Sequence, residues 1–251
     1  MTDARSDSRS PAFLIATLAR LIEGARHIAV GASSPIPGSA ALLVRRRSAG
    51  ATRVTVLGSR INNAFTDGGR ELFDCAAQGR IDVFFLGGGQ IDGEANINLV
   101  GTGGYPRSTV RFPGSFGSAY LYFLVPRVIL FREEHSRRVF VPKVEFVSAP
   151  GWSPPEVYRP GGPAALLTSL CLFDFDRARH RFALRSVHPG HTLEEVRDQT
   201  GFDFDVPNFD GPDSVPTTPV PDEATLAEIR AVGSEIAETY PQFAARLAAA
   251  A

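Results

Sequence analysis

The sequence predicts an α/β protein with an open, mostly parallel but mixed sheet and helices on both faces of that sheet. Three observations lead to this fold class. Short apolar strands alternate with helices through the first half of the 251-residue chain. These strands are apolar almost without interruption, as is typical of strands buried on both faces. A later pair of segments has the pattern of an antiparallel hairpin, which makes the sheet mixed.

The first three elements are a helix, a strand and a second helix. Residues 12–22 carry apolar side chains at helical spacing, and the apolar residues 27–30 form a strand that ends at Gly31. Serine and proline residues then make a turn before a helix through residues 42–44. Three arginines, residues 45–47, close this helix, and their charge suits the carbonyl end of the helix dipole.

The same strand, turn and helix pattern then recurs. Residues 53–57 are rich in β-branched side chains and predict a strand, and residues 69–78 predict a helix. A third strand covers residues 82–86 and stops at three glycines, and residues 128–131 predict a fourth. A strand joined to a helix by a short turn of small residues is the building unit of a parallel sheet.

The second half of the chain has a different pattern. Residues 166–174 and 181–187 predict the antiparallel hairpin. Prolines punctuate residues 201–221, which is typical of an extended arm. Asp222 then caps a helix with one apolar face, formed by Leu226, Ile229, Val232, Ile236 and Tyr240.

The predicted domain organisation has three parts. Residues 1–10 are polar and of mixed charge, and we expect them to be disordered. Residues 11–205 form one α/β domain, and residues 206–251 form a proline-rich arm with a C-terminal helix. The polar first residues do not have the pattern of a signal peptide.

Composition excludes several function classes. The formal net charge is −1, whereas a nucleic-acid binder needs a basic surface. The single lysine, Lys143, is not in a glycine-rich loop, which excludes a phosphate-binding NTPase loop. Residues 119–126, the longest apolar run, fall far short of the roughly 20 residues that cross a bilayer. Cys75 and Cys171 indicate no disulfide framework, so we expect a cytoplasmic protein without nucleic-acid or membrane partners.

A glycine-rich segment follows the strand 82–86, at the edge of the sheet where open α/β folds bind ligands. Glycines let a ligand approach bare backbone N–H groups. The alternative is a turn held by Asx hydrogen bonds that only reverses the chain. The candidate ligand contacts are Gly87, Gly88, Gly89 and Gln90, with Asp92, Asn96 and Asn98 as further polar side chains.

A second cluster of small residues covers residues 112–119. It contains Gly114 and Ser115, followed by three successive backbone amides that are candidates for an oxyanion hole, those of Gly117, Ser118 and Ala119. The motif of a serine nucleophile is absent from this cluster.

The segment 188–196 contains two histidines, His188 and His191, separated by Pro-Gly. A metal site is one interpretation. The other is a turn that leads into a short helix, because Thr192 and Glu195 have the spacing of a capping box.

With these segments in view, the chain resembles the β subunit of class I coenzyme A transferases, in the glutaconate CoA-transferase branch. The resemblance covers about residues 12–205. It rests on four ordered motifs: Gly31 with its Ser/Pro turn, residues 85–98, residues 112–119 and residues 188–202. It implies the CoA-transferase fold, paired α and β chains with the active site between them, and a β-chain glutamate that attacks the acyl-CoA.

The sequence departs from this family at the glutamate. The resemblance places that residue after the second strand, but here the strand leads into Gly58-Ser59-Arg60-Ile61-Asn62-Asn63, and no carboxylate follows until Asp67. Without a nucleophilic carboxylate, the mixed anhydride that carries CoA between acids does not form on this chain.

The chain is also similar to the β subunits of a subgroup of hydrolases that lack this glutamate and open a cyclic-diketone CoA thioester in actinobacterial cholesterol breakdown. This similarity implies retro-Claisen hydrolysis, with the general base on the α chain, a CoA thioester as substrate, no tightly bound cofactor, no metal, and an α2β2 heterotetramer. We expect the supporting catalytic groups to be Asn62, Gly117, Ser118 and Ala119. The expected substrate contacts are Ser33, Ser34, Ser59, Asn63, Gly87, Gly88, Gly89, Gln90, Gly114 and Ser115.

Two other functions remain open. One is a CoA-transferase that uses another carboxylate, such as Asp67 or Glu94. The other is a scaffold subunit that has lost its nucleophile. For Asn62 and Asn63 the alternative is that they only close a turn after the strand, as asparagine often does.

Overall fold

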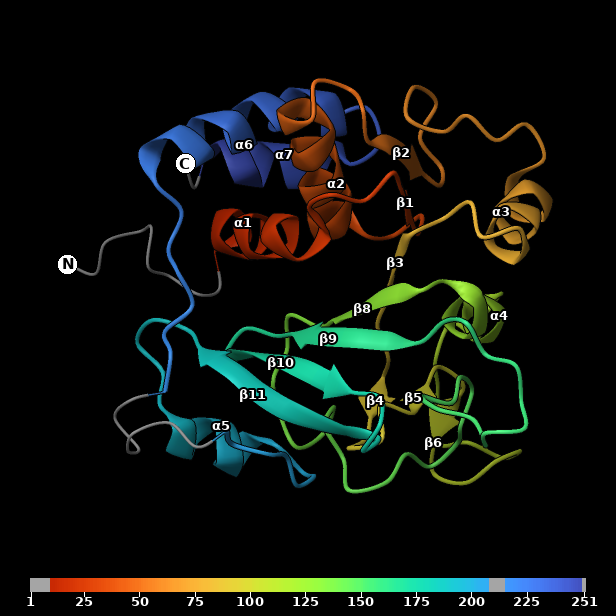
Figure 1. The fold of residues 1–251 in the computed structure, drawn as a ribbon. Helices are drawn as coiled ribbons and strands as arrows, with labels where there is room; N and C mark the ends of the chain where they lie inside the picture. The colour runs from red at the N-terminus through yellow and green to blue at the C-terminus, as the bar shows by residue number, and fades with distance from the viewer. Residues whose placement is uncertain (1–9, 208–214, 250–251) are drawn as a thin grey trace. The chain divides into compact units, whose positions relative to one another are not determined.

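The computed structural model describes residues 10–207 and 215–249 (Figure 1). The chain divides into two compact units: residues 1–85 together with 219–251, and residues 86–218. This division differs from the predicted domain 11–205 with an appended arm, because the C-terminal helices return to the first unit. The predicted disordered segment lies outside the described residues except for Ser10.

The strands of the first unit are parallel, in the order β3, β1, β2. They are β1 (His27–Val30), β2 (Arg53–Val56) and β3 (Val83–Leu86). Ile28 of β1 is the register partner of residues on both neighbouring strands, and every residue of β1 is buried. The three predicted strands, and the parallel βα arrangement inferred from them, are confirmed.

The helices of this unit are α1 (Pro11–Ile22), α2 (Pro35–Arg47), α3 (Gly68–Ala77), α6 (Glu223–Ile236) and α7 (Pro241–Ala249). In Figure 1, α6 lies against α2, and α7 packs against α6. The sequence did not predict α7 as a separate helix.

Helix α6 packs on α2 and α1 through the predicted apolar face. The buried residues of that face are Leu226, Ile229, Val232 and Ile236. At its polar edge, Arg45 pairs with Glu235 and Arg47 with Glu228, each at 2.7 Å. Such partly exposed pairs stabilise the contact by at most about 1 kcal/mol each, whereas each buried aliphatic side chain contributes about 1.5–3 kcal/mol. Apolar packing therefore holds α6 in place.

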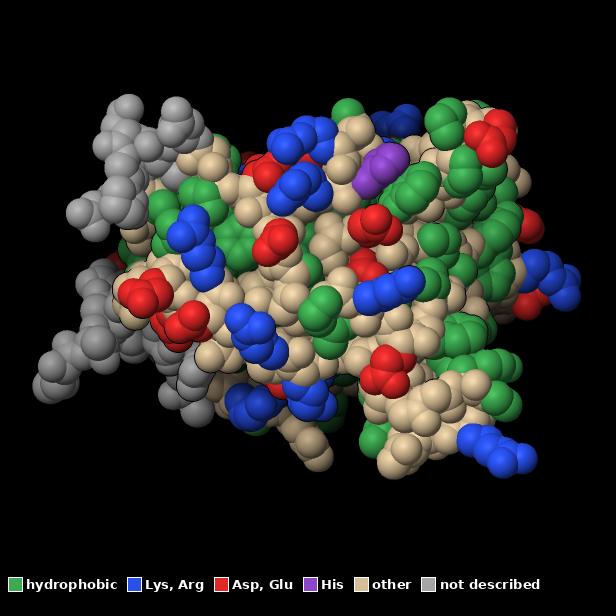
Figure 2. Space-filling view, turned by 90° about the horizontal axis from the view of Figure 1, so that it is seen from below, with side chains coloured by type: hydrophobic (Ala, Val, Ile, Leu, Met, Phe, Trp, Pro, Cys, Tyr) green, Lys and Arg blue, Asp and Glu red, His purple; other side chains and the backbone are tan. Residues whose placement is uncertain are grey.

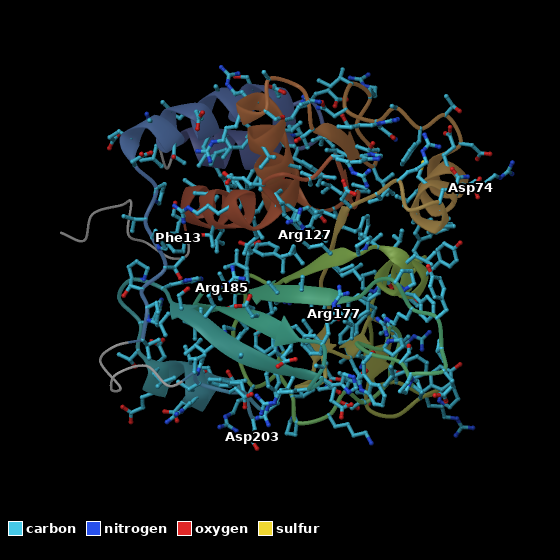
Figure 3. All side chains as sticks on the ribbon, viewed as in Figure 1. Phe13, Asp74, Arg127, Arg177, Arg185 and Asp203 are labelled. Carbon is cyan, nitrogen blue, oxygen red and sulfur yellow. The ribbon has the colours of Figure 1, made fainter. Side chains whose placement is uncertain are left out.

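The second unit contains a mixed sheet in the order β11, β10, β9, β8. These strands are β8 (Arg127–Phe131), β9 (Pro163–Leu167), β10 (Cys171–Asp176) and β11 (Arg181–Val187). Strand β9 is parallel to β8 and antiparallel to β10, which pairs antiparallel with β11. Arg185 of β11 donates to Asp174 across the hairpin (Figure 3).

The prediction of a single strand over residues 166–174 was wrong, because the structure has two strands there, β9 and β10. The chain turns at residues 168–170, where the Thr168 hydroxyl accepts from the N–H groups of Leu170 (3.1 Å) and Cys171 (3.2 Å). This side-chain bond replaces ladder bonds at the turn. The apolar side chains on both sides of the turn hid the break from the sequence pattern.

Short elements complete the second unit: β4 (Gln90–Ile91), β5 (Ile97–Asn98), β6 (Gly101–Thr102), β7 (Val110–Arg111), α4 (Ser118–Leu124) and α5 (Leu193–Gln199). Helix α5 begins as predicted, with the Thr192 side chain accepting from the Glu195 N–H. Among the helices of the described residues, none is long and apolar enough to cross a membrane.

Two histidines are buried in this unit among threonines. The His135 ring bonds the hydroxyls of Thr168 (2.8 Å) and Thr200 (2.9 Å). The His188 ring bonds the Thr218 hydroxyl (2.8 Å) and the Thr168 carbonyl (3.0 Å). His188 therefore fits the turn interpretation of its segment. Within residues 10–207 and 215–249, no three His, Cys, Asp or Glu side chains are grouped to hold a metal ion.

Burial makes this pair of histidines sensitive to acid. Loss of hydration lowers the pKa of His135 to about 3 and that of His188 to about 4. Below pH 6.5 the unfolded chain binds protons that the folded chain does not, so stability falls as the pH falls through this window. We expect a loss on the order of 1 kcal/mol per pH unit for each histidine between pH 6 and 5.

Chemical denaturation at several pH values measures this loss. The variant His188→Gln should show a clearly shallower slope than the wild type, because one of the two protonations is gone. An unchanged slope in that variant would show that other groups cause the acid sensitivity.

Candidate functional site

Two loops lie side by side at the carboxyl ends of β1 and β2, where a parallel sheet presents ligand-binding loops. The first is Gly31–Ser34 and the second is Gly58–Asn63. Gly58 has φ +86°, which favours glycine, and a Cβ on it would lie 3.6 Å from the Ala32 Cβ. The structure therefore brings the predicted residues Ser33 and Ser34 near the second loop, which carries the predicted Ser59, Asn62 and Asn63.

Asn62 is 95% buried and its main chain is fully bonded. Its N–H donates to the Ser59 hydroxyl (2.9 Å), and its carbonyl accepts from the Val56 N–H (2.7 Å). The side-chain Nδ2 has no partner among the described residues. A buried unpaired donor costs about 1–3 kcal/mol, so this amide gains that amount from any ligand oxygen that reaches it. The main chain of Asn62 thus closes the turn, as the alternative interpretation expected, while its buried side-chain Nδ2 has no partner among the described residues.

Apart from Ser33, the other predicted site residues of these loops are engaged within the protein. The Asn63 side-chain oxygen accepts from the Phe65 N–H (3.1 Å), an Asx turn that fits the turn-closing interpretation. The Ser59 hydroxyl donates to Glu238 and accepts from the Asn62 N–H. Ser33 is exposed, and the Ser34 N–H donates to the Tyr240 hydroxyl (3.4 Å).

Glu238 supplies a carboxylate to the second loop that the sequence did not predict. Its Oε2 accepts from the Ser59 hydroxyl (2.7 Å) and the Thr239 hydroxyl (2.8 Å). Its Oε1 accepts from the N–H (3.1 Å) and Nε (3.2 Å) of Arg60. In the described part of the chain, no other Asp or Glu is hydrogen-bonded to residues 58–63. Glu238 follows this loop by nearly 180 positions, so no local pattern links the two.

These hydrogen bonds determine what Glu238 does chemically. The bonds from Ser59, Thr239 and Arg60 hold the pKa of its carboxyl at about 2. A carboxylate of that pKa is too weak a base to activate water near neutral pH. Each of its oxygens already accepts two hydrogen bonds, which also makes it a poor nucleophile. Glu238 therefore holds the loop and is not suited to the reaction itself.

The two carboxylates considered from the sequence lie elsewhere. Asp67 precedes α3, is largely exposed and pairs with Arg70 (3.1 Å). Glu94 belongs to the second unit and accepts from the Trp152 indole N–H (3.2 Å).

Packing within the second unit explains the glycines at 87–89. A Cβ on Gly87 would meet a main-chain oxygen of Phe131 at 2.9 Å, and one on Gly88 a main-chain oxygen of Gln90 at 2.7 Å. A Cβ on Gly89 would lie 2.2 Å from the Phe112 ring. The close approach that requires glycine here is thus made by the protein's own atoms.

The polar residues of the same segment form internal networks. The Gln90 side chain accepts from the Asn98 amide (2.8 Å) and donates to Glu145 (3.0 Å). The Asp92 carboxylate accepts from the N–H groups of Glu94 (3.1 Å) and Asn96 (3.0 Å). These bonds favour the Asx-turn interpretation of the segment over direct ligand contact by its side chains.

In the cluster at residues 112–119, one of the backbone amides predicted for an oxyanion hole is bonded within the protein. The Ser118 N–H donates to the Ser115 carbonyl at 2.8 Å, so this amide does not face a ligand. The predicted contribution of the Ser118 amide was therefore wrong. The Ser118 hydroxyl is buried and has no partner among the described residues. Gly114 has φ +104° and its N–H donates to the Leu99 carbonyl (3.1 Å), while Phe116 has φ +42° and is 82% exposed.

The surface of the described residues carries both signs of charge. On the face seen in Figure 2, basic and acidic side chains lie interspersed with apolar ones.

Comparison with known proteins gives relatives of several activities. A model of the coenzyme A transferase family matches residues 7–199. The chain is 33% identical over 170 residues to the B subunit of 3-oxoadipate CoA-transferase from Pseudomonas knackmussii, covering 65% of this chain and 63% of that protein. It is 33% identical over 131 residues to the B subunit of glutaconate CoA-transferase from Acidaminococcus fermentans (49% and 48%). It is 31% identical over 151 residues to the cholesterol ring-cleaving hydrolase IpdB subunit of Rhodococcus jostii (53% and 54%). The matches span 48–63% of these relatives' own length.

Solved structures share the fold over most of the chain. A chain of the decarboxylase AibA/AibB superposes with a TM-score of 0.73 at 25% identity, covering 88% of this chain and 94% of that chain. IpdAB of Rhodococcus jostii superposes with a TM-score of 0.74 at 24% identity, covering 88% and 92%. One fold thus carries transferases, a ring-cleaving hydrolase and a decarboxylase, so the chemistry has to be argued from the site.

Proposed function

This chain belongs to the coenzyme A transferase family, and from that premise we propose that it is the β-type subunit of a two-chain enzyme that acts on a CoA thioester. We propose further that the enzyme opens a ring of its substrate by C–C hydrolysis, with water as the nucleophile. In this proposal CoA belongs to the substrate, and the enzyme needs no other cofactor.

One observation carries the proposal. In the loop after β2, where the resemblance to transferases requires a glutamate, the chain has Asn62 with a buried and unpartnered amide. Anhydride formation needs a carboxylate with a free lone pair. Asn62 has no carboxylate, and the oxygens of Glu238 beside it are fully bonded. An amide donor instead suits an oxygen that gains negative charge.

The reaction balances without a covalent intermediate on this chain. A base of the α subunit takes a proton from water, and the hydroxide oxygen bonds to a ring ketone carbon. The ring C–C bond then breaks, its electron pair forms an enolate, and the enolate carbon takes the proton back. The product is a ring-opened carboxylic acid that still carries its CoA thioester. Asn62 Nδ2 donates to the ketone oxygen as it becomes an oxyanion, and loss of such a donor typically costs about 10²–10³ in rate.

The names of the relatives support a partner subunit, whereas the identity of the substrate is our proposal. The relatives in Pseudomonas, Acidaminococcus and Rhodococcus are each named as one subunit of their enzyme, B or IpdB, which supports an α subunit for this chain. The α2β2 stoichiometry is part of our proposal. The Rhodococcus relative is named as a cholesterol ring-cleaving hydrolase, which supports a polycyclic substrate.

CoA transfer is the second candidate function, because two of the relatives are named as CoA-transferases at 33% identity. An assay of the chain purified with the product of its neighbouring gene separates the two functions. Our proposal expects ring opening of cyclic-diketone CoA thioesters and no exchange of CoA between a thioester and a free acid. Exchange at a rate comparable to hydrolysis would favour the transferase.

A further inference from the structure

The connection between α6 and α7, residues 237–240, contacts both loops of the candidate site. The Tyr240 hydroxyl donates to the Ala32 carbonyl (2.7 Å) and accepts from the Ser34 N–H (3.4 Å) in the first loop. Glu238 accepts from Ser59 and Arg60 in the second loop. Two residues of one short segment thus hold both loops of the candidate site.

The packing of α6 explains why the connection reaches these loops. Helix α2 begins directly after the first loop, and α6 packs along α2. Gly38 in the first turns of α2 leaves room, because a Cβ there would lie 3.2 Å from Ile236 Cδ1 and 3.8 Å from the Tyr240 ring. The close approach of the last turn of α6 to α2 places residues 238–240 over the carboxyl ends of the strands.

A chain of hydrogen bonds links Glu238 to Asn62 through Ser59. The Ser59 hydroxyl donates its single proton to Glu238 and accepts from the Asn62 N–H. A hydroxyl has one proton and rotates freely about its C–O bond. The Glu238 carboxylate fixes that proton, which leaves a lone pair aimed at the Asn62 main chain. Because this carboxylate stays ionised at all pH values near neutrality, the link does not titrate there.

We propose that Glu238 and Tyr240 are positioning residues, which lock the loops Gly31–Ser34 and Gly58–Asn63 so that the Asn62 amide is held ready for the substrate oxygen. The proposal rests on the function proposed above. Neither residue touches the substrate, and both act through the loops. The C-terminal segment, which the sequence suggested to be an appended arm, is then part of the site's support.

The test uses the full-length chain purified with its partner subunit, in the variants Glu238→Ala and Tyr240→Phe. The matched control is Glu235→Ala, which removes a glutamate one turn earlier that pairs with Arg45 of α2 and not with a loop. Hydrogen exchange followed by mass spectrometry reports the opening of residues 58–63. We expect exchange in this segment to be faster in Glu238→Ala by on the order of tenfold, and unchanged in the control.

Turnover supplies the second measurement. We expect Glu238→Ala and Tyr240→Phe to lower kcat by on the order of tenfold with a smaller change in KM, because the amide orientation matters most in the transition state. In an Asn62→Ala background the loss caused by Glu238→Ala should vanish, because there is no amide left to position. A purely structural role would give the same loss in both backgrounds.

Two results would overturn the proposal. One is unchanged exchange of residues 58–63 in Glu238→Ala. The other is a loss of kcat in Glu238→Ala that persists in full without the Asn62 side chain. If the wild-type pair exchanges CoA and does not open rings, the proposed function fails, but the same double-mutant cycle measured on CoA exchange still decides whether Glu238 positions Asn62.

Discussion

Replacement of Asn62 with glutamate is expected to reduce C–C hydrolysis by the assembled enzyme by on the order of tenfold or more. The glutamate carries no N–H to donate to the ketone oxygen, and its negative charge opposes the charge that develops there. It also places a nucleophile beside the acyl group. With simple acyl-CoA substrates we therefore expect slow formation of an anhydride that hydroxylamine traps.

The control for this variant is Gln78→Glu, which also replaces an amide with a carboxylate, without added length, at the exposed end of α3. It should leave turnover unchanged. The steady-state kcat of both variants, with melting temperatures to show that each is folded, checks the prediction. Normal turnover by folded Asn62→Glu enzyme, even with a lowered melting temperature, would remove Asn62 from the site and leave it a turn-closing residue.

The chain alone is expected to turn over CoA thioesters about 10²–10⁴-fold more slowly than the pair, which is the usual contribution of a general acid–base group. The reason is that the candidate site contains no suitable base. Glu238 is tied to Ser59 and Arg60, while Asp67 and Glu94 are bonded elsewhere among the described residues.

The kcat of the isolated chain and of the co-purified pair, on the same substrate, measures this dependence. Circular dichroism and melting temperature establish that the isolated chain is folded. A folded homo-oligomer that works at the rate of the pair would contradict the prediction, and it would place the base on this chain.

The fold was predictable because its main signals are local. The strands β1 and β3 are mostly apolar, β2 is rich in β-branched residues, and small residues follow each strand closely, so their burial and parallel pairing could be inferred. The break inside residues 166–174 could not, since a threonine hydroxyl makes that turn within an apolar run. The burial of His135 could not be predicted either, since its two threonine partners are distant in sequence.

The candidate site was predictable only in part. The loop 58–63 and the place of Asn62 after β2 follow from the strand pattern and the resemblance. The bond between Glu238 and Ser59 joins residues 179 positions apart, and no periodicity or spacing encodes it. The glycines at 87–89 were predicted to contact a ligand, whereas the atoms that approach them closely in the structure belong to the protein itself. Backbone amides carry no sequence signal for their partners, which is why the Ser118 amide was misassigned.

The central claim is that water, and not a carboxylate of this chain, attacks the substrate. A single turnover of the co-purified pair in H₂¹⁸O, followed by mass spectrometry of both product and protein, tests it most directly. The account predicts one ¹⁸O atom in the new carboxyl group of the ring-opened product and none in any peptide of this chain. An ¹⁸O atom in a glutamate or aspartate of this chain would show that an anhydride had formed there and been hydrolysed, and would contradict the account.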